Sequence, residues 1–385
     1  MKRRSYLKRT GAGVAGIAAL AGCTGGDGGS AGTDAGGTDT ATPTPTDTPT
    51  GTSTGTATET PGEPSGTLRV ATYSSFTGEG TAGTWLKGVF EEAYPGVTVE
   101  FTTPSNGINQ YIQRARQGAP IDVDAYVGLN TGELVRVDET LDDPLFAEIE
   151  GRLERAGDVK PGLRIDPEGR AIPYDTGYIS LVYDEDEVSN PGTFDALLEP
   201  AYEGDLITQN AQQSDPGRAF LLWTIIAKGE DGYLDYWSRL VDNGVKILSD
   251  WEPAYQAYLD GEAPMVVSYS TDQVYYHGEG VDMSRHQVGF LNDQGYANPE
   301  TMAVFADAPN PEAALAFVDF ALTPEAQAGI AVRNVQFPAV EGVDPGEEFS
   351  KYAYEPAEPV TFTYDDLAGN VGTWVDRWAR QVASK

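Results

Sequence analysis

The apolar positions between residues 246 and 276 predict a strand, a helix and a second strand in succession. Short apolar runs at 245–248 and 265–267 have the composition of buried strands. Between them, Tyr and Leu residues recur at helical spacing over 255–259, and Gly261 ends the helix. We therefore expect the polar and aromatic residues after 267 to form a loop at the end of a buried strand.

Residues 67–129 alternate between strand-like and helix-like patterns. Apolar runs at 68–73, 97–101 and 123–129 predict strands, and apolar residues at helical spacing over 84–94 and 108–117 predict helices. This order of strands and helices favours a parallel sheet.

Three loops follow these strands, at Tyr73-Ser74, Asn106-Gly107 and Leu129-Asn130. Open α/β folds bind their ligands at the carboxyl ends of parallel strands, so polar residues in these loops are candidates for ligand contacts. Each pair is also explained as an ordinary turn, for which Asn-Gly is a frequent choice.

A second set of alternating elements begins near residue 171. Apolar runs at 171–183 and 206–208 predict strands, and an apolar helix is expected over 219–227. Ser214 and Asp215 precede this helix, so either side chain is a candidate helix cap. The same helix end could instead face a ligand with its free backbone amides, and the sequence leaves both interpretations open.

The last part of the chain predicts a strand and further helices. A strand over 301–306 is expected to return to the first set of elements, and helices are expected over 311–322 and 324–332. A final helix over 364–385 carries Trp374 and Trp378, which we expect to pack as core.

Residues 1–23 have the pattern of a twin-arginine export signal with a lipoprotein cleavage site. Arg3 and Arg4 precede an apolar run at 11–20 that is too short to cross a membrane. The run ends in Leu-Ala-Gly-Cys, so Cys23 is the expected lipidation site and would anchor the protein at the extracellular face of the cell membrane. A cleaved leader with an incidental cysteine is the alternative.

Residues 24–66 consist almost entirely of Gly, Thr, Asp, Ser and Pro. A segment of this composition cannot bury a hydrophobic core, and we expect a disordered tether. The folded domain would then work close to the membrane surface.

Acidic residues dominate the charge of the chain. There are 59 Asp and Glu against 25 Lys and Arg, with a formal net charge of −34. Nothing in such a chain can replace phosphate counterions, which excludes nucleic-acid binding. The excess is typical of proteins from salt-loving organisms, where high ionic strength screens self-repulsion, so it is not by itself evidence for a cation site.

The chain has one cysteine, Cys23, and two histidines, His277 and His286. The folded part therefore has no disulfide, thiolate metal site or cysteine nucleophile. Neither histidine lies in a metal-binding or catalytic-triad motif. We expect no metal site, no cofactor, no catalytic residues and no enzyme activity.

Aromatic and carboxylate side chains gather around the strand–helix–strand unit at 246–276. Trp251 follows the first strand, and Tyr269 and Asp272 follow the second. A cation over an aromatic face gains about 0.5–2 kcal/mol, and a carboxylate would add opposite charge. The expected ligand is therefore small, flat and cationic. The alternative is that the aromatic rings are half-buried core.

Several segments resemble, in the same order, those of the periplasmic thiamine-binding proteins of ABC importers. The resemblance covers the chain from about residue 68 to its end. The matching segments are Tyr73-Ser74-Ser75-Phe76, Pro173-Tyr174-Asp175-Thr176-Gly177-Tyr178, Ser214-Asp215-Pro216-Gly217, Trp251-Glu252-Pro253-Ala254-Tyr255 and Ser268-Tyr269-Ser270-Thr271.

The resemblance implies an α/β fold of the two-lobed type II periplasmic-binding-protein kind, with mixed sheets, flanking helices and a hinge between lobes. Lobe 1 would comprise 67–172 and about 300–341, lobe 2 would comprise 173–299, and 342–385 would be a C-terminal helical segment. It also implies a lipoprotein that delivers thiamine, or a thiamine ester or precursor, to the permease and ATPase subunits of an importer.

The resemblance also implies which residues contact the ligand. Rings at four positions would surround a thiamine, and the remaining residues belong to the binding loops. The implied ligand-binding residues are Tyr73, Ser74, Asn106, Gly107, Ser214, Asp215, Trp251, Tyr269, Ser270, Thr271, Asp272 and Tyr275.

The chain departs from the family pattern at several of these positions. Ser74 stands where the family has an acid, Gly80 lies opposite a family tryptophan, and Val335 replaces another. Asp215 and Asp272 replace hydroxyl residues and would restore negative charge near a cation.

Other functions are compatible with parts of the sequence. Tyr275 and Tyr276 resemble the tyrosine pair of ferric-binding proteins, since two phenolates suit a hard trivalent metal. A polyamine would also use aromatic walls and carboxylates. A secreted thiamine-degrading enzyme would need a nucleophile, and a purely structural surface protein would not need a cluster of polar aromatic loops.

Overall fold

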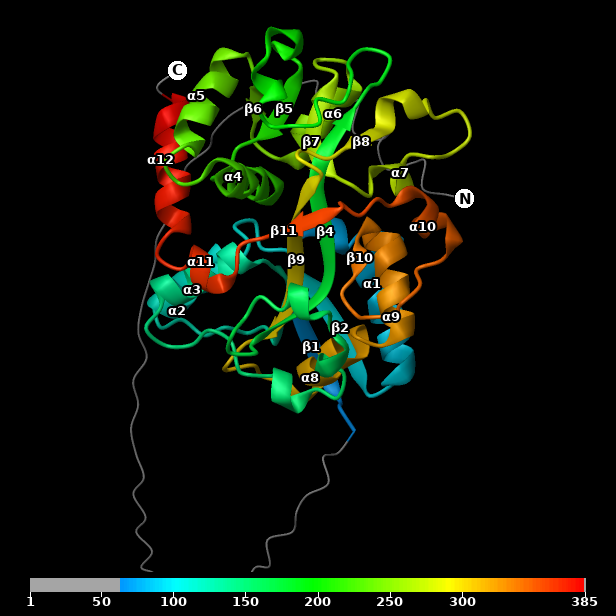
Figure 1. Ribbon diagram of the computed structural model, residues 1–385. Coiled ribbons are helices and arrows are strands. Elements are labelled where there is room, and N and C mark those ends of the chain that lie inside the picture. Colours follow the sequence, from blue (N-terminus) through cyan, green and yellow to red (C-terminus); the bar gives the residue numbers. More distant parts are fainter. Residues whose placement is uncertain (1–62, 384–385) are drawn as a thin grey trace, which may run out of the picture. The chain divides into compact units, whose positions relative to one another are not determined.

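A hydrogen-bonded sheet of mixed strand direction runs through the part of the chain that the structure describes (Figure 1). The computed structural model describes residues 63–383, so the predicted signal, its lipidation site Cys23 and the tether up to residue 62 lie outside the described residues. The strands are β1 (Gly66–Ala71), β2 (Val97–Thr102), β3 (Ala125–Leu129), β4 (Ala171–Tyr183), β5 (Leu206–Gln209), β6 (Lys246–Leu248), β7 (Met265–Tyr269), β8 (Gln287–Gly289), β9 (Gln294–Val304), β10 (Phe337–Pro338) and β11 (Glu358–Val360).

The order along the main path of the sheet is β2-β1-β3-β9-β4-β7-β5-β6. β1 pairs in parallel with both β2 and β3, which confirms the predicted parallel arrangement. The loops after these strands consequently lie at one edge of the sheet. β1 begins at Gly66, two residues earlier than the predicted strand at 68–73, because Gly66 pairs with Val97.

Two long strands, β4 with 13 residues and β9 with 11, join the two halves of the sheet (Figure 1). They pair in antiparallel fashion over residues 171–179 of β4. β3 pairs with the end of β9, as expected of a returning strand, and β7 pairs with residues 179–183 of β4. The expected fold class is confirmed, with the difference that the sheets of the two lobes form one continuous sheet through β4 and β9.

Helices cover the sheet and fill the connections between strands. They are α1 (Ala82–Ala93), α2 (Asn109–Arg116), α3 (Thr131–Thr140), α4 (Asp215–Lys228), α5 (Tyr233–Asp242), α6 (Trp251–Leu259), α7 (Asp272–Tyr275), α8 (Pro311–Ala321), α9 (Pro324–Ile330), α10 (Glu347–Tyr352), α11 (Tyr364–Leu367) and α12 (Val371–Ala383). Two of these helices, α3 and α5, were not predicted from the sequence. The predicted helix at 364–385 is divided into α11 and α12.

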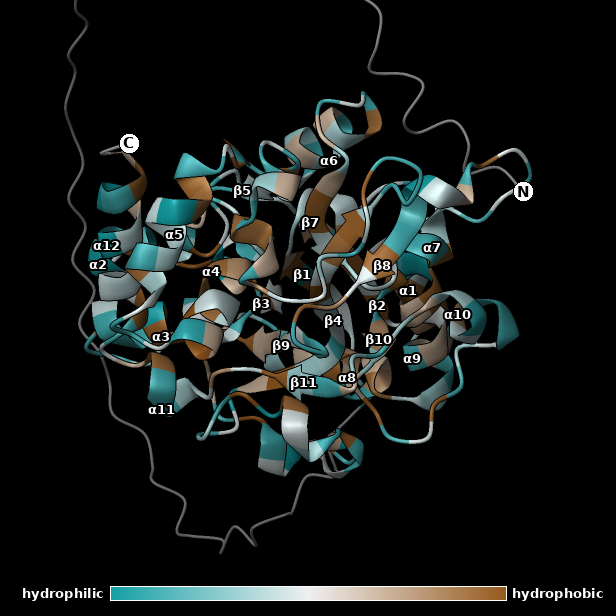
Figure 2. Cartoon of the chain, turned by 45° about the horizontal axis from the view of Figure 1, so that its top comes forward, coloured by the Kyte–Doolittle hydropathy of each residue, from teal (hydrophilic) through white to brown (hydrophobic). Residues whose placement is uncertain are grey.

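Two large apolar clusters lie on either side of the middle of the sheet. The first joins β1, β2 and β3 to α1, α8 and α9. The second joins β7 and the end of β4 to α4, α5 and α12, and Figure 2 shows hydrophobic residues along β7 and α4. Trp374 and Trp378 are buried in the second cluster, which confirms their predicted place in the core. The proposed lobe boundaries stay a prediction.

No single helix in residues 63–383 is both long enough and apolar enough to span a membrane. Two consecutive helical segments, Pro311–Ala321 and Pro324–Val335, are together long enough and apolar enough to span a membrane, but they are bent by 77° relative to each other. Ala314, Phe317 and Ile330 of this pair are fully buried in the first apolar cluster.

Candidate ligand-binding site

The alternation of side chains along β4 places a row of polar residues on one face of the sheet. Asp175 pairs with Glu300 of β9, Gly177 with Asn298, and Ile179 with Tyr269 of β7. Directly opposed residues in antiparallel strands share a face, so Asp175, Glu300, Asn298 and Tyr269 lie on the same surface. This surface, formed by β4, β7 and β9, is the floor of the candidate site.

The floor carries two adjacent carboxyl groups, those of the fully buried Asp175 and the half-buried Glu300. The hydroxyls of Tyr73 and Tyr174 donate to Glu300 Oε2 at 2.8 Å and 2.5 Å. Asn334 Nδ2 donates to Asp175 Oδ2 at 2.6 Å. The other oxygen, Asp175 Oδ1, is buried and has no hydrogen-bond partner among the described residues.

Burial is the largest cause of the raised pKa values of these two carboxyl groups. It raises the pKa of Asp175 well above its ordinary value, and the neighbouring Glu300 charge adds to the rise. Burial likewise raises the pKa of Glu300 to about 7, although hydrogen bonds from Tyr174 and Tyr73 oppose the rise. Burial also raises the pKa of Tyr73, so its hydroxyl stays protonated and donates.

The rings of Tyr73 and Tyr269 pack closely against glycines of the sheet. A Cβ on Gly128 of β3 would lie 2.5 Å from the Tyr73 ring, and a Cβ on Gly177 would lie 2.5 Å from the Tyr269 ring. Only glycine leaves room for these rings. The charges of Asp215, Glu300 and Asp175 all act on Tyr269, so the two rings border the same acidic surface.

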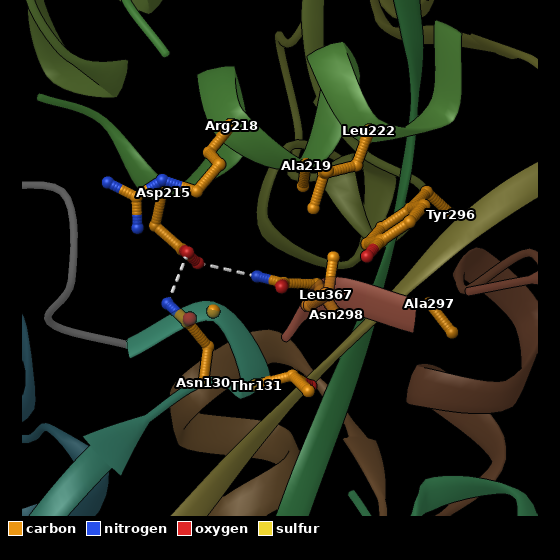
Figure 3. A pocket seen from close by; sticks show the side chains of 11 residues that line it. Asn130, Thr131, Asp215, Arg218, Ala219, Leu222, Tyr296, Ala297, Asn298 and Leu367 are labelled. Atoms are coloured by element: carbon orange, nitrogen blue, oxygen red, sulfur yellow. Dashed lines mark hydrogen bonds between the residues drawn. The ribbon is translucent and has the colours of Figure 1, made fainter. Parts of the chain in front are cut away.

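Asp215 connects three elements at one end of the floor (Figure 3). Its carboxylate accepts hydrogen bonds at 2.5 Å from Asn130 Nδ2, at the start of α3, and from Asn298 Nδ2 of β9. Ser214 occupies the N-cap position of α4 but its side chain makes no capping bond, and its buried hydroxyl has no partner among the described residues. A small pocket lined by Asn130, Asp215, Arg218, Tyr296 and Asn298 adjoins this point.

Trp251 is the first residue of α6, where Asp250 caps the helix by accepting a bond from the Trp251 backbone amide. Its half-buried indole stacks on Tyr255 with the ring centroids 5.0 Å apart. Trp251 Nε1 donates to Ser268 Oγ at 3.1 Å, which ties the indole to the residue before Tyr269.

Asp272 is engaged inside the protein rather than free on the floor. It lies 2.8 Å from His286 Nδ1 and accepts a bond from the Tyr255 hydroxyl at 2.5 Å. Burial raises its pKa, and the His286 hydrogen bond opposes the rise. These two partners satisfy both carboxylate oxygens, so a direct ligand contact by Asp272 stays a prediction.

The expected polar loop after β7 is partly the short helix α7. Ser270 and Thr271 are buried before it, and Ser270 Oγ has no partner among the described residues. Tyr275 is 44% exposed, and the centroid of its ring lies 4.8 Å from the centroid of the Tyr276 ring.

The remaining predicted residues lie in outer loops. Ser74 is exposed in a short 3-10 turn after β1, and Asn106 is exposed in the turn before α2. Gly107 has a φ of +52°, a conformation that glycine adopts without strain. No described contact brings Ser74 or Asn106 to the floor, and their roles stay predictions.

The sequence analysis did not choose the carboxyl pair itself. Asp175 was noted only as part of a matching segment, and Glu300 was not singled out. A charged residue inside an otherwise apolar strand pattern was the available signal, since buried charge needs a specific partner. The partners Tyr73, Tyr174 and Asn334 become visible only once β4, β9, the turn after β1 and the turn 331–335 after α9 lie together.

This polar floor at the junction of two sheet halves defines a solute-binding protein. The family model described as bacterial extracellular solute-binding protein matches residues 87–356, and the chain belongs to that family.

Within the family, the chain is similar to thiamine-binding proteins, which confirms the resemblance seen in the motifs. The thiamine-binding periplasmic protein of Escherichia coli is 28% identical over 317 residues, covering 82% of this chain and 93% of that protein. A solved periplasmic thiamin binding protein superposes with a TM-score of 0.72 at 26% identity, covering 83% of this chain and 96% of the other. The ferric binding protein of Campylobacter jejuni, at 16% identity and a TM-score of 0.67 over 82% of this chain and 99% of its own, shares the fold.

Proposed function

We propose that this protein captures thiamine, or a thiamine ester or precursor, outside the cell and delivers it to an ABC permease with its ATPase. The observation that carries the proposal is the floor itself, where Tyr73 and Tyr269 border the buried Asp175–Glu300 pair. Thiamine combines a permanent thiazolium cation with a flat aminopyrimidine. Aromatic faces and carboxylates bind the cation, and buried unpartnered oxygens accept hydrogen bonds from the amine.

Enclosure between two lobes would supply the affinity. In the proposed division, lobe 1 comprises 67–172 and about 300–341, and lobe 2 comprises 173–299. β4 and β9 pass through both and would act as the hinge. Closure would bring Trp251 of lobe 2 and Tyr73 of lobe 1 onto the same ligand and present the closed pair to the permease.

Titration with thiamine tests the proposal. Added thiamine is expected to quench the tryptophan fluorescence of the protein without producing colour, and mass spectrometry of the purified protein is expected to find thiamine or an ester. Release of free pyrimidine on incubation would indicate an enzyme instead. Absence of both quenching and binding heat would contradict the proposal, and binding of spermidine alone would replace thiamine with a polyamine.

The tyrosine pair Tyr275–Tyr276 supports ferric iron as the ligand less well than the floor supports thiamine. Tyr276 stacks on His286 with the ring centroids 4.4 Å apart, and burial raises the pKa of its hydroxyl, with Asp272 adding to the rise. Both effects disfavour the phenolate that iron requires. Within residues 63–383, no group of three His, Cys, Asp or Glu side chains is placed to hold a metal ion. Iron binding would produce a visible tyrosinate charge-transfer band, so colourless titration with ferric citrate is the expected result.

The proposed lipid anchor at Cys23 has its own test. Replacing Cys23 with Ser is expected to move the protein from the membrane fraction to the medium, because the thiol that carries the lipid is lost. An Arg3→Lys, Arg4→Lys variant serves as control and is expected to keep the protein inside the cell. Cys23→Ser protein that stays in the membrane fraction would contradict the anchor.

A further inference from the structure

The Asp175–Glu300 pair places two acids side by side in the middle of the sheet. Their backbones are directly paired across β4 and β9. Asp175 is fully buried, and Glu300 receives hydroxyl donors from two tyrosines. Hydroxyl and amide groups supply the hydrogen bonds of the pair, and neither carboxylate has a salt bridge to a cationic side chain among the described residues.

The surroundings of the pair are acidic and phenolic. The charged and titratable groups that face it come from the β1–α1 turn, β3, α3, β4, α4 and β7, and they are Tyr73, Tyr126, Glu133, Tyr174, Asp215 and Tyr269. Arg136 and Arg218 act on Glu133 and Asp215. Among the described residues, neither arginine makes a salt bridge to Asp175 or Glu300.

From this geometry we infer that Asp175 and Glu300 recognise the positive charge of the ligand, and that a proton held by the pair is released to solvent when the cation binds. The inference rests on the proposed capture of a cationic ligand. In this inference the two acids of the floor bind the cationic group of the ligand. Asp272 does not, because its carboxylate is already hydrogen-bonded to His286 and Tyr255.

The physical reason is the cost of buried charge. Two adjacent carboxylates without a cation are disfavoured at low dielectric, so at least one stays protonated. A thiazolium next to the pair stabilises the charged form and expels the proton. The buried, unpartnered oxygens Asp175 Oδ1 and Gln336 Oε1 remain to accept hydrogen bonds from the ligand.

The sign of the pH dependence follows from these shifts. The pKa of Glu300 lies at about 7 without ligand, and a bound cation lowers it. Proton release therefore occurs below pH 7, where the ligand-free protein still holds the proton. The affinity for thiamine is expected to rise by up to about tenfold per pH unit toward pH 7 and to level off above it.

Isothermal titration calorimetry with thiamine tests the inference. Titrations at pH 6 in cacodylate and in ACES, which differ in ionisation enthalpy, measure the protons exchanged. The wild-type protein is expected to release up to about one proton per thiamine bound. The variants Glu300→Gln and Asp175→Asn are expected to lose most of this proton release. At pH 8 they are expected to bind thiamine as weakly as the wild-type protein does at acidic pH. Glu312→Gln, which removes an exposed carboxylate of α8, is the matched control and should behave as wild type.

The possible results separate the inference from the function on which it rests. Thiamine binding by the wild type without proton exchange between pH 5 and 8 overturns the inference alone, even if the variants do not fold. Unchanged proton release in folded Glu300→Gln and Asp175→Asn proteins does the same. Absence of any thiamine binding overturns the proposed function and the inference together.

Discussion

Replacing Arg170 with Met is expected to lower the free energy of unfolding by about 3–5 kcal/mol, because it leaves buried carboxylates without their cation. The Arg170 guanidinium makes two hydrogen bonds of 2.9 Å to Asp138 and one of 2.9 Å to Asp166. The side chains of Arg170 and Asp166 are 6% and 0% exposed. Tyr364 also donates to Asp138, so this network ties α3 and the C-terminal segment to the start of β4.

Urea unfolding followed by circular dichroism measures this change. The matched control is Arg69→Met, which removes an exposed pair whose Arg69 and Glu100 side chains lie 3.8 Å apart and are 46% and 61% exposed. Such a pair contributes about 0–1 kcal/mol. Equal stability of the Arg170 and Arg69 variants would show that the network does not hold the start of β4.

Replacing Trp251 with Ala is expected to weaken thiamine binding by about 1–3 kcal/mol, or about 5- to 150-fold in Kd. The indole is half-buried, stacks on Tyr255 and is held in place by its bond to Ser268. A ligand cation over its free face would gain both stacking and enclosure. Calorimetric titration at pH 8, above the Glu300 pKa of about 7, measures the loss.

Trp374→Phe is the matched control for this experiment. Trp374 is buried in the second apolar cluster, on α12, and its loss should leave the thiamine affinity unchanged. The fluorescence quench by thiamine should survive in Trp374→Phe and disappear in Trp251→Ala. Unchanged affinity in a folded Trp251→Ala protein would remove Trp251 from the site.

The local apolar patterns of the sequence were sufficient to predict many of the strands and helices of the fold. The apolar positions of β1, β2 and β3 and the helices between them predicted a parallel sheet, because strands that alternate with helices along the chain usually pair in parallel. The same patterns were not used to predict α3 or α5, although the buried residues of α5, from Tyr233 to Leu240, have the spacing of an amphipathic helix. They also missed β10 and β11, which have two and three residues and owe their existence to their pairing partners.

The candidate site was predictable to a smaller extent. Asp215 was chosen at the start of a helix whose backbone amides could face a ligand. Tyr73, Tyr269 and Trp251 were chosen because polar and aromatic residues after strand ends are typical of ligand sites. Asp272 was chosen by the same rule, but its partner His286 lies 14 residues away in sequence and pairs with it only in the folded chain. Proximity along the chain cannot distinguish a carboxylate that faces a ligand from one that already has a hydrogen-bond partner inside the protein.

By itself the sequence determined the order of strands and helices, the absence of a cysteine from the folded part and the aromatic residues at strand ends, because these depend on residue type and short-range spacing. Only the tertiary structure decided that Asp175 and Glu300 face each other, since they are 125 positions apart and meet through the register of β4 against β9. That register places two acids side by side, and burial raises the pKa of both.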